Sequence, residues 1–196
     1  NTLADGWYTI HFRSKDKSGN YSDPVSQSYY SDSKAPVITT AKDGSSSESS
    51  SWYEKGPFSL TGSITEATKD DPAGGMKTWN YSMYYKANTA DPYGTTPELG
   101  HENVDMTPIT TGNSWTIENT SGADGKYKYV ITATDMAGYS AVITREIFID
   151  TTPPILAVTN LVSGNIISTA DYTYRGTLTD TPAGPKNVYY QLIQHP

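Results

Sequence analysis

The chain has 196 residues and a formal net charge of -7. Its 14 Lys and Arg residues are scattered without a basic run, which excludes the clustered cationic footprint that nucleic-acid binding requires. No stretch approaches the roughly 20 consecutive apolar residues that span a bilayer, so we expect no membrane insertion, and residues 1–5 lack the basic start and apolar core of a signal peptide.

The composition favours strands over helices. Only 35% of the residues are hydrophobic, but 16 Tyr, 4 Trp and 3 Phe supply large side chains whose burial opposes disorder. Sixteen Gly and 12 Pro separate runs rich in Thr, Tyr, Val and Ile, which are typical of short strands joined by turns. The absence of Cys excludes disulfides and fits either a reducing cytosol or a bacterial exterior. We expect an all-β protein.

The first recognisable element is a strand near the start of the chain that recurs later. Residues 5–19 align without gaps on residues 124–138, and both copies open with Asp-Gly-x-Tyr. After a one-residue gap the match continues through the next strand and a proline-containing linker, so the period is about 118 residues. A period of this size is a domain length, far above the about 20 to 50 residues of solenoid repeats.

A weaker match relates residues 58–66 to residues 172–180. The two matches together predict three parts of the chain. Residues 1–35 are expected to be the C-terminal strands of one repeat, residues 36–153 a complete repeat, and residues 154–196 the N-terminal strands of a further repeat. Proline restricts the backbone at both boundaries, so the linkers are expected to be short and stiff.

The paired copies indicate which side of the recurring strand is buried. One set of alternate positions is largely apolar in both copies and the other is largely polar, which is typical of an antiparallel sheet packed on one side. The predicted core positions are Tyr8, Ile10, Phe12 and Ser14 in the first copy and Tyr127, Tyr129, Ile131 and Ala133 in the second.

The complete repeat is predicted to contain several more strands. They are expected at residues 36–41, 57–66, 77–86, 104–109, 114–119 and 139–150. In the last of these, Ile143, Ile147, Phe148 and Ile149 fit no single register, so its buried side stays open. The serine-rich residues 43–51 are predicted to form a flexible hydrophilic loop.

Seven short strands fit a β-sandwich, and the Asp-Gly-x-Tyr opening resembles a tyrosine corner, in which the hydroxyls of Tyr8 and Tyr127 would bond back to the preceding connection. The closing segment combines this motif with Asp135-x-x-Gly138 and a Thr-Thr-Pro-Pro linker after Asp150. It resembles the closing strands of bacterial immunoglobulin-like repeats of large secreted and cell-surface proteins. The resemblance implies tandem immunoglobulin-like β-sandwiches, one complete and two partial, outside the cell or on its surface. It leaves the ligand open.

Catalytic signatures are not found in the sequence. There is no Gly-x-Ser-x-Gly, no phosphate-binding loop and no His-Glu-x-x-His, so we do not predict an enzyme. His101 and Glu102 with Asp105 resemble half of a metal site, but two neighbouring ligands specify little geometry and a solvated loop is the favoured interpretation.

Calcium is the one cofactor that the sequence leaves open. Carboxylates near domain junctions can supply its hard oxygen ligands. The candidate ligands are Asp16, Asn20 and Asp32 in the first copy, and Glu66, Asp135 and Asp150 in the second. The alternative is that Asp16 and Asp135 accept backbone N–H bonds in the turns before the following glycines.

Tyr84 and Tyr93 are the candidate binding surface. Alternation places Trp79, Tyr81 and Met83 on the core side of their strand, so Tyr84 is predicted to point outward. Tyr93 lies in residues 88–112, the longest irregular stretch of the repeat and the expected place for specific binding.

Two functions follow as hypotheses. The first is a non-catalytic spacer, stalk or adhesin shaft of an extracellular bacterial surface protein. The alternative is a carbohydrate- or protein-binding accessory module of a secreted enzyme or adhesin, with a host or matrix glycan or protein as partner. Open half-sandwiches expose strand edges and apolar faces, so neighbouring immunoglobulin-like repeats of the same or adjacent chains are expected to cover them, in a longer chain or a head-to-tail filament.

Overall fold

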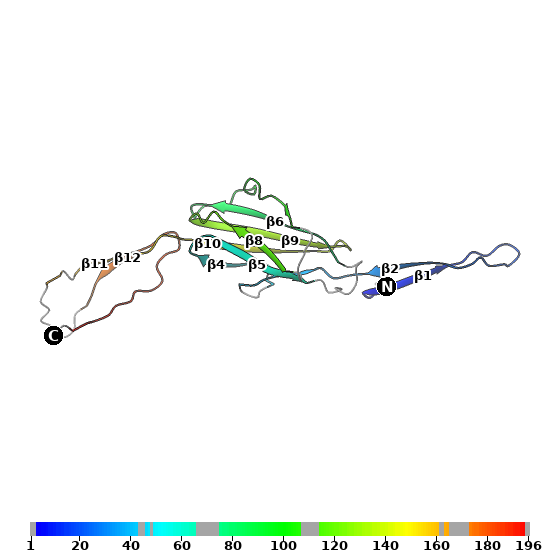
Figure 1. Cartoon of the computed structure of the whole chain (residues 1–196), viewed down its shortest axis with the longest axis horizontal. Helices are drawn as coiled ribbons and strands as arrows, with labels where there is room; N and C mark the ends of the chain where they lie inside the picture. Colours follow the sequence, from blue (N-terminus) through cyan, green and yellow to red (C-terminus); the bar gives the residue numbers. More distant parts are fainter. Residues whose placement is uncertain are drawn as a thin grey trace.

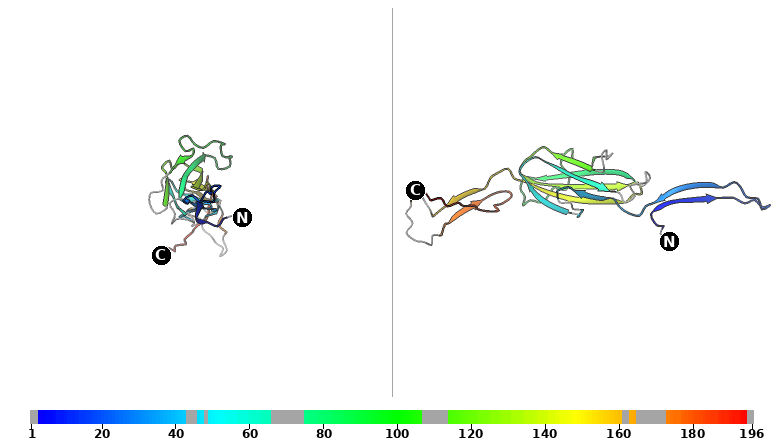
Figure 2. Two further views of the ribbon diagram at one scale, coloured as in Figure 1. Left: turned by 90° about the vertical axis from the view of Figure 1, so that its right-hand side faces the viewer. Right: turned by 60° about the horizontal axis from the view of Figure 1, so that its bottom comes forward.

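The computed structural model describes residues 3–42, 46–47, 49–65, 75–106, 114–160, 163–164 and 173–194. These residues form strands, turns and irregular segments without a helix, which confirms the predicted all-β class. The strands fall into three groups along the chain (Figure 1). A first hairpin precedes a body of two sheets, and a second hairpin follows it. Figures 1 and 2 show the two hairpins at opposite ends of the body.

The body is a β-sandwich of one five-stranded and one three-stranded sheet. The larger sheet has the order β4 (Ser49–Glu54), β10 (Ser140–Ile149), β9 (Gly125–Asp135), β6 (Met76–Lys86) and β7 (Val104–Asp105). The smaller sheet has the order β3 (Val37–Thr40), β5 (Phe58–Thr65) and β8 (Ser114–Asn119). All described pairs in the sandwich are antiparallel except β4 with β10, which is parallel.

The core lies between the inner faces of the two sheets. Its buried apolar side chains come from both, and the Trp79 ring of β6 lies 5.6 Å from the Trp115 ring of β8. Strand β9 alternates strictly between buried and half-buried residues. The predicted core positions Tyr127, Tyr129 and Ile131 are all buried, together with Ala133, which confirms the predicted face of this strand.

A buried arginine, Arg145, explains why the buried side of β10 could not be predicted from its sequence. Ile143, Ile147 and Ile149 point into the core, but the position between the first two on this face is Arg145. Its fully buried guanidinium donates from Nε to Thr40 Oγ1 at 2.9 Å and from Nη1 to the carbonyls of Ser47 and Thr144. A buried charged group is costly unless it is hydrogen-bonded. The bond from Arg145 to Thr40 also connects β10 to β3.

The prediction that residues 43–51 form a loop is wrong from Ser49 onward. Strand β4 begins there and pairs with β10, and the Tyr53 ring stacks on Phe148 with centroids 4.9 Å apart. Serine has little strand preference of its own, so this strand depends on its partner. Residues 43–45 and 48 lie outside the described residues, as do residues 107–109 of the strand predicted at 104–109.

The first hairpin, β1 (Gly6–Phe12) and β2 (Val25–Ser31), has the register of β9 and β10: Tyr8 pairs with Tyr29 as Tyr127 pairs with Ile147. The burial is different. Ile10 and Phe12 are 43% and 55% exposed, so the predicted core face of the first copy is not covered by any described residues. The reason is that these two strands form a sheet by themselves, without a second sheet across them.

The last hairpin repeats the pairing of β3 with β5. Strands β11 (Ile155–Val158) and β12 (Gly176–Thr179) pair in the same register, with Gly176 at the position of Gly62. At both positions a Cβ atom would meet a backbone carbonyl oxygen of the neighbouring strand, at 2.0 Å in the sandwich and 2.3 Å in the hairpin. The weaker sequence match therefore has a counterpart in strand pairing.

Replacement of Gly62 is predicted to disrupt the sandwich. In Gly62→Ala the added Cβ would lie 2.0 Å from the Thr39 carbonyl oxygen and 2.3 Å from the Trp115 ring, both held by packing. We expect the free energy of unfolding in urea to fall by about 1 to 3 kcal/mol or more. Gly56→Ala, where a Cβ meets no atom within 4 Å, is the control and should leave it nearly unchanged. Equal midpoints for the two variants would contradict the close approach.

Candidate functional site

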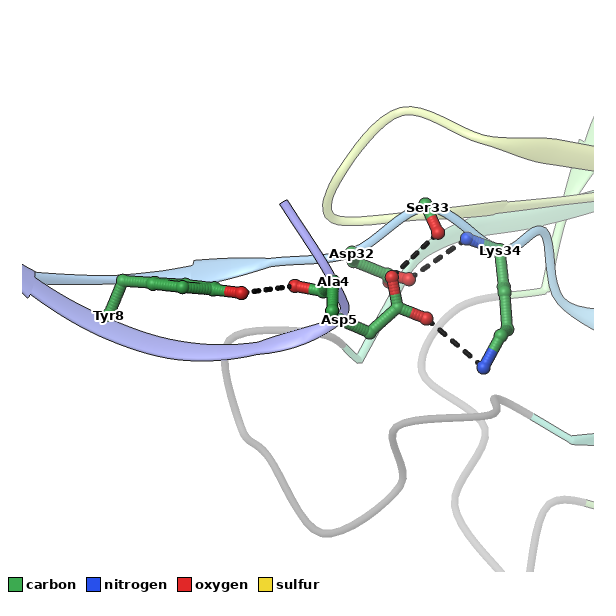
Figure 3. A network of polar contacts seen from close by, with 6 residues as sticks. All are labelled: Ala4, Asp5, Tyr8, Asp32, Ser33 and Lys34. Carbon is green, nitrogen blue, oxygen red and sulfur yellow. Dashed lines mark hydrogen bonds and ion pairs between the residues drawn. The ribbon is translucent and has the colours of Figure 1, made fainter. Parts of the chain in front are cut away.

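The Asp-Gly-x-Tyr motif forms the same corner in both copies. The Tyr127 hydroxyl donates to the Ala123 carbonyl at 3.1 Å, and the Tyr8 hydroxyl donates to the Ala4 carbonyl at 2.9 Å (Figure 3). These are the bonds to the preceding connection that the sequence predicts for a tyrosine corner. The Tyr127 ring is buried, whereas Tyr8 is half-buried because its hairpin has no facing sheet.

The aspartate of the same motif holds the linker that leaves the paired strand. Asp124 Oδ1 accepts from the Thr151 backbone N at 2.8 Å and from its hydroxyl at 2.7 Å, and Oδ2 accepts from the Thr152 hydroxyl at 3.2 Å. These bonds, above all those from Thr151, hold the pKa of the Asp124 carboxyl below its usual value. This linker role of Asp124 was not predicted from the sequence, although Asp precedes Gly in both copies of the motif.

Figure 3 shows the matching network in the first copy. Asp5 Oδ1 accepts from the Ser33 hydroxyl at 2.6 Å, and Oδ2 forms an ion pair with Lys34 at 3.1 Å. The hydrogen bond from Ser33, followed by that from Lys34, lowers the pKa of the Asp5 carboxyl. At both junctions, therefore, the aspartate of the Asp-Gly-x-Tyr motif holds the first residues of the linker.

Asp32 and Asp150, two candidate calcium ligands, also have linker roles. The Oδ1 atom of each accepts from the backbone N of the residue two positions on, Lys34 at 3.1 Å and Thr152 at 3.0 Å. Asp150 Oδ2 also accepts from the Ala183 backbone N at 2.9 Å. The bonds of Asp150 connect the end of the sandwich to the segment that follows it, and the bond of Asp32 lies in the linker before the sandwich.

Asp16 and Asp135 lie in turns with the same geometry. The backbone N of Asn20 donates to Asp16 Oδ1 at 2.8 Å, and that of Tyr139 donates to Asp135 Oδ1 at 2.9 Å. The glycine before each donor has a φ of +96°. The bond from the Asn20 backbone, the larger cause, and the Asn20 side-chain amide lower the pKa of the Asp16 carboxyl. This is the turn role that the sequence left as the alternative to calcium.

Of the candidate calcium ligands that the structure describes, only Asp16 and Asn20 are in contact, through hydrogen bonds from Asn20 to the Asp16 carboxylate. Asp16 and Asp32 lie beyond opposite ends of β2, and Asp135 and Asp150 lie beyond opposite ends of β10, whose ten residues span about 33 Å. Glu66 is outside the described residues. The described part of the chain contains no group of three or more metal-binding side chains. Asp16 and Asp32 are therefore too far apart to bind one calcium ion, and so are Asp135 and Asp150.

Tyr84 and Tyr93, by contrast, both contact Lys128 of the five-stranded sheet. The ammonium of Lys128 on β9 lies 3.9 Å from the Tyr84 ring centroid and 4.6 Å from that of Tyr93. Two further lysines approach Tyr93, Lys86 at 4.8 Å and Lys126 at 5.4 Å. We call these five side chains the lysine–tyrosine surface. The sequence predicted its tyrosines and missed its lysines, which lie on two different strands.

Tyr93 fixes the loop after β6 on the sheet. Burial, followed by the charge of Glu146, raises the pKa of the Tyr93 hydroxyl. Glu146 itself forms an ion pair with Lys126 at 2.7 Å, and the ammonium of Lys126 lies 4.9 Å from the Phe148 ring centroid. The surface therefore continues from Lys126 onto the stacked rings of Phe148 and Tyr53.

The same loop also borders a cavity of about 310 Å³ at the edge between the two sheets. Glu98 and His101 of the loop face Glu118 and Asn119 of β8 there. The inner polar groups are bonded within the fold, because Asn119 donates to the Tyr129 hydroxyl at 2.9 Å. The His101 ring Nδ1 lies 3.4 Å from the Tyr81 hydroxyl. Among the described residues, His101, Glu102 and Asp105 do not form a metal-binding group.

Comparison with known proteins does not assign the chain to a family. No protein-family model matches the chain, and no curated protein matches it. Among the described residues no helix has the length and apolar character needed to cross a membrane.

The corner hydrogen bond is predicted to stabilise the sandwich. Tyr127→Phe keeps the packed ring and removes the bond to Ala123, so we expect the free energy of unfolding to fall by about 1 kcal/mol. Tyr139→Phe, which changes an exposed ring, is the matched control and should alter it by less than about 0.5 kcal/mol. Chemical denaturation measures both, and indistinguishable losses would show that the corner bond contributes nothing.

Asp124 is predicted to make the linker junction sensitive to acid. Its folded-state pKa lies below the ordinary value of 3.8, so its stabilising effect is complete above 3.8 and is lost as the pH falls through the folded-state pKa. In an NMR titration we expect the Thr151 amide resonance to shift with a midpoint below 3.8, and this step to be absent in Asp124→Asn. A midpoint at or above 3.8 would contradict the linker contact.

Proposed function

We propose that the chain is a non-catalytic spacer or stalk of an extracellular bacterial surface protein, built from tandem immunoglobulin-like repeats. The observation that carries the proposal is the course of the chain through the sandwich. The first strand, β3, lies beside β10, because Arg145 bonds to Thr40 and because Val37 and Ile143 line one shallow cleft. The chain therefore enters near the start of β10 and leaves at its end, about 33 Å away.

This course suits a load-bearing module. A pull on the two linkers acts along the strands, so the ladder between β4 and β10 is loaded in shear and its hydrogen bonds must break together. The matching bonds of Asp5 and Asp124 to their linkers support a tandem arrangement with stiff junctions. An adhesin shaft needs both properties.

Neighbouring repeats are the proposed partners of the two hairpins. Ile10 and Phe12 are exposed at positions where the sandwich buries Tyr129 and Ile131, and Leu156 is exposed at the position of buried Ile38. Apolar faces of this kind favour a covering surface. Repeats of the same chain, or of an adjacent chain in a filament, would supply it.

Single-molecule pulling tests the stalk proposal. The chain has no Cys, so engineered pairs attach handles at unique points. With Ala35→Cys and Pro154→Cys the sandwich is pulled along β10. With Ala35→Cys and Ala137→Cys both handles lie near one end and the strands are peeled apart. We expect a clearly higher unfolding force for the first pair, because bonds loaded in shear break together. Equal forces for the two pairs would overturn the proposal.

A second candidate function, a carbohydrate- or protein-binding module, is favoured by one observation. The rings of the two tyrosines singled out from the sequence both lie within 5 Å of the Lys128 ammonium, at 3.9 Å and 4.6 Å. Half-buried rings beside a cation combine apolar contact area with a polar anchor, which suits a binding surface.

A further inference from the structure

The lysine–tyrosine surface concentrates positive charge in an acidic chain. Strand pairing places Lys86 of β6 directly opposite Lys126 of β9, and Lys128 is two residues further along β9 on the same face. Like charges directly opposite one another destabilise a sheet. Of these three lysines, only Lys126 forms an ion pair with a described carboxylate, that of Glu146. A locally unfavourable arrangement of this kind is expected at functional sites.

The three lysines are not equivalent. Lys86 Nζ donates to the backbone carbonyls of Thr89 and Asp91 and so holds the loop that carries Tyr93. Lys126 is paired with Glu146. Lys128 has neither kind of partner in the described structure, and its contacts are the rings of Tyr84 and Tyr93. Its ammonium is therefore the cation of this surface that can bind an anionic ligand without breaking either an ion pair or a hydrogen bond to the loop.

Aromatic rings extend the surface on the side of Lys126. Phe148 pairs with Lys126 across β9 and β10, and Tyr53 of β4 stacks on Phe148 and is 58% exposed. The C–H faces of a sugar ring pack on such rings, while its hydroxyl and carboxylate groups point outward to polar partners. Because rings and lysines follow one open face of a sheet, they suit an extended chain with repeated charges.

We propose that the lysine–tyrosine surface, with Tyr53 and Phe148, binds an anionic polysaccharide through carboxylates of its uronic acid residues. This inference rests on the second function proposed above and names its ligand class. Lys128 binds a carboxylate, and Tyr84 and Tyr53 pack against sugar rings on either side. An acidic peptide offers the same charge but lacks the C–H faces that the exposed rings would cover.

Polygalacturonate tests the proposal directly. The whole chain is titrated with this polymer, with the same polymer after methyl esterification of its carboxylates, and with poly-glutamate. We expect binding to polygalacturonate alone, and weaker binding at high salt because exposed charges are screened. In Lys128→Gln the affinity should fall about tenfold, the effect of losing one charge-assisted hydrogen bond.

Lys77→Gln is the matched control, because it removes the same charge from an exposed position at the other end of β6 and should leave the affinity unchanged. Tyr53→Ala alters an exposed ring, so it should fold and bind less tightly even if Lys128→Gln is unstable. Equal losses in the Lys128 and Lys77 variants, or unchanged binding by Tyr53→Ala, overturn the proposal.

The polymers separate failure of the inference from failure of the function. Equal affinity for the esterified polymer overturns the role of the anion but leaves a carbohydrate-binding module. Equal affinity for poly-glutamate overturns the glycan and leaves a protein-binding module. Binding of none of the three polymers overturns both the inference and the second function.

Discussion

The alternation of buried and half-buried side chains along strand β9 is the constraint on which the rest of the structure depends. As a central strand of the larger sheet it has a neighbour on each side, and its side chains point alternately to the core and to the outside. Tyr127, Tyr129 and Ile131 form much of the core, while Lys126 and Lys128 form the outer surface. A shift of one residue would bury the two lysines and expose the tyrosines, so packing and the candidate site share one register.

The ends of the same strand shape the junctions. At its start the Asp-Gly-x-Tyr motif uses the tyrosine to hold the incoming connection and the aspartate to hold the outgoing linker. At its end Asp135 closes the turn into β10. The first hairpin keeps all three contacts although its apolar face is exposed. These contacts therefore depend on local sequence and on strand pairing, and they do not require a covered core.

The course of β10 connects packing to the proposed mechanical role. Its inner face carries the buried Arg145, which reaches across to β3, and its edge pairs with β4 in parallel. These two contacts place the first strands of the sandwich alongside the last one and send the linkers in opposite directions. The lysine–tyrosine surface does not disturb these contacts, because its lysines lie on the outer side of the sheet and Arg145 lies on the inner side.

The sequence by itself determined the all-β class, the buried face of β9 and the turn alternative for Asp16 and Asp135, since these depend on alternation and on contacts between near neighbours in the chain. It also singled out Tyr84 and Tyr93. Only the tertiary structure decided that β4 is a strand, that Arg145 lies in the core, and that Asp135 and Asp150 lie beyond opposite ends of β10. It alone brought Lys128 next to both tyrosines. Each of these depends on pairing between residues far apart in sequence, and a pattern of neighbouring residues carries no information about which distant strand supplies the partner.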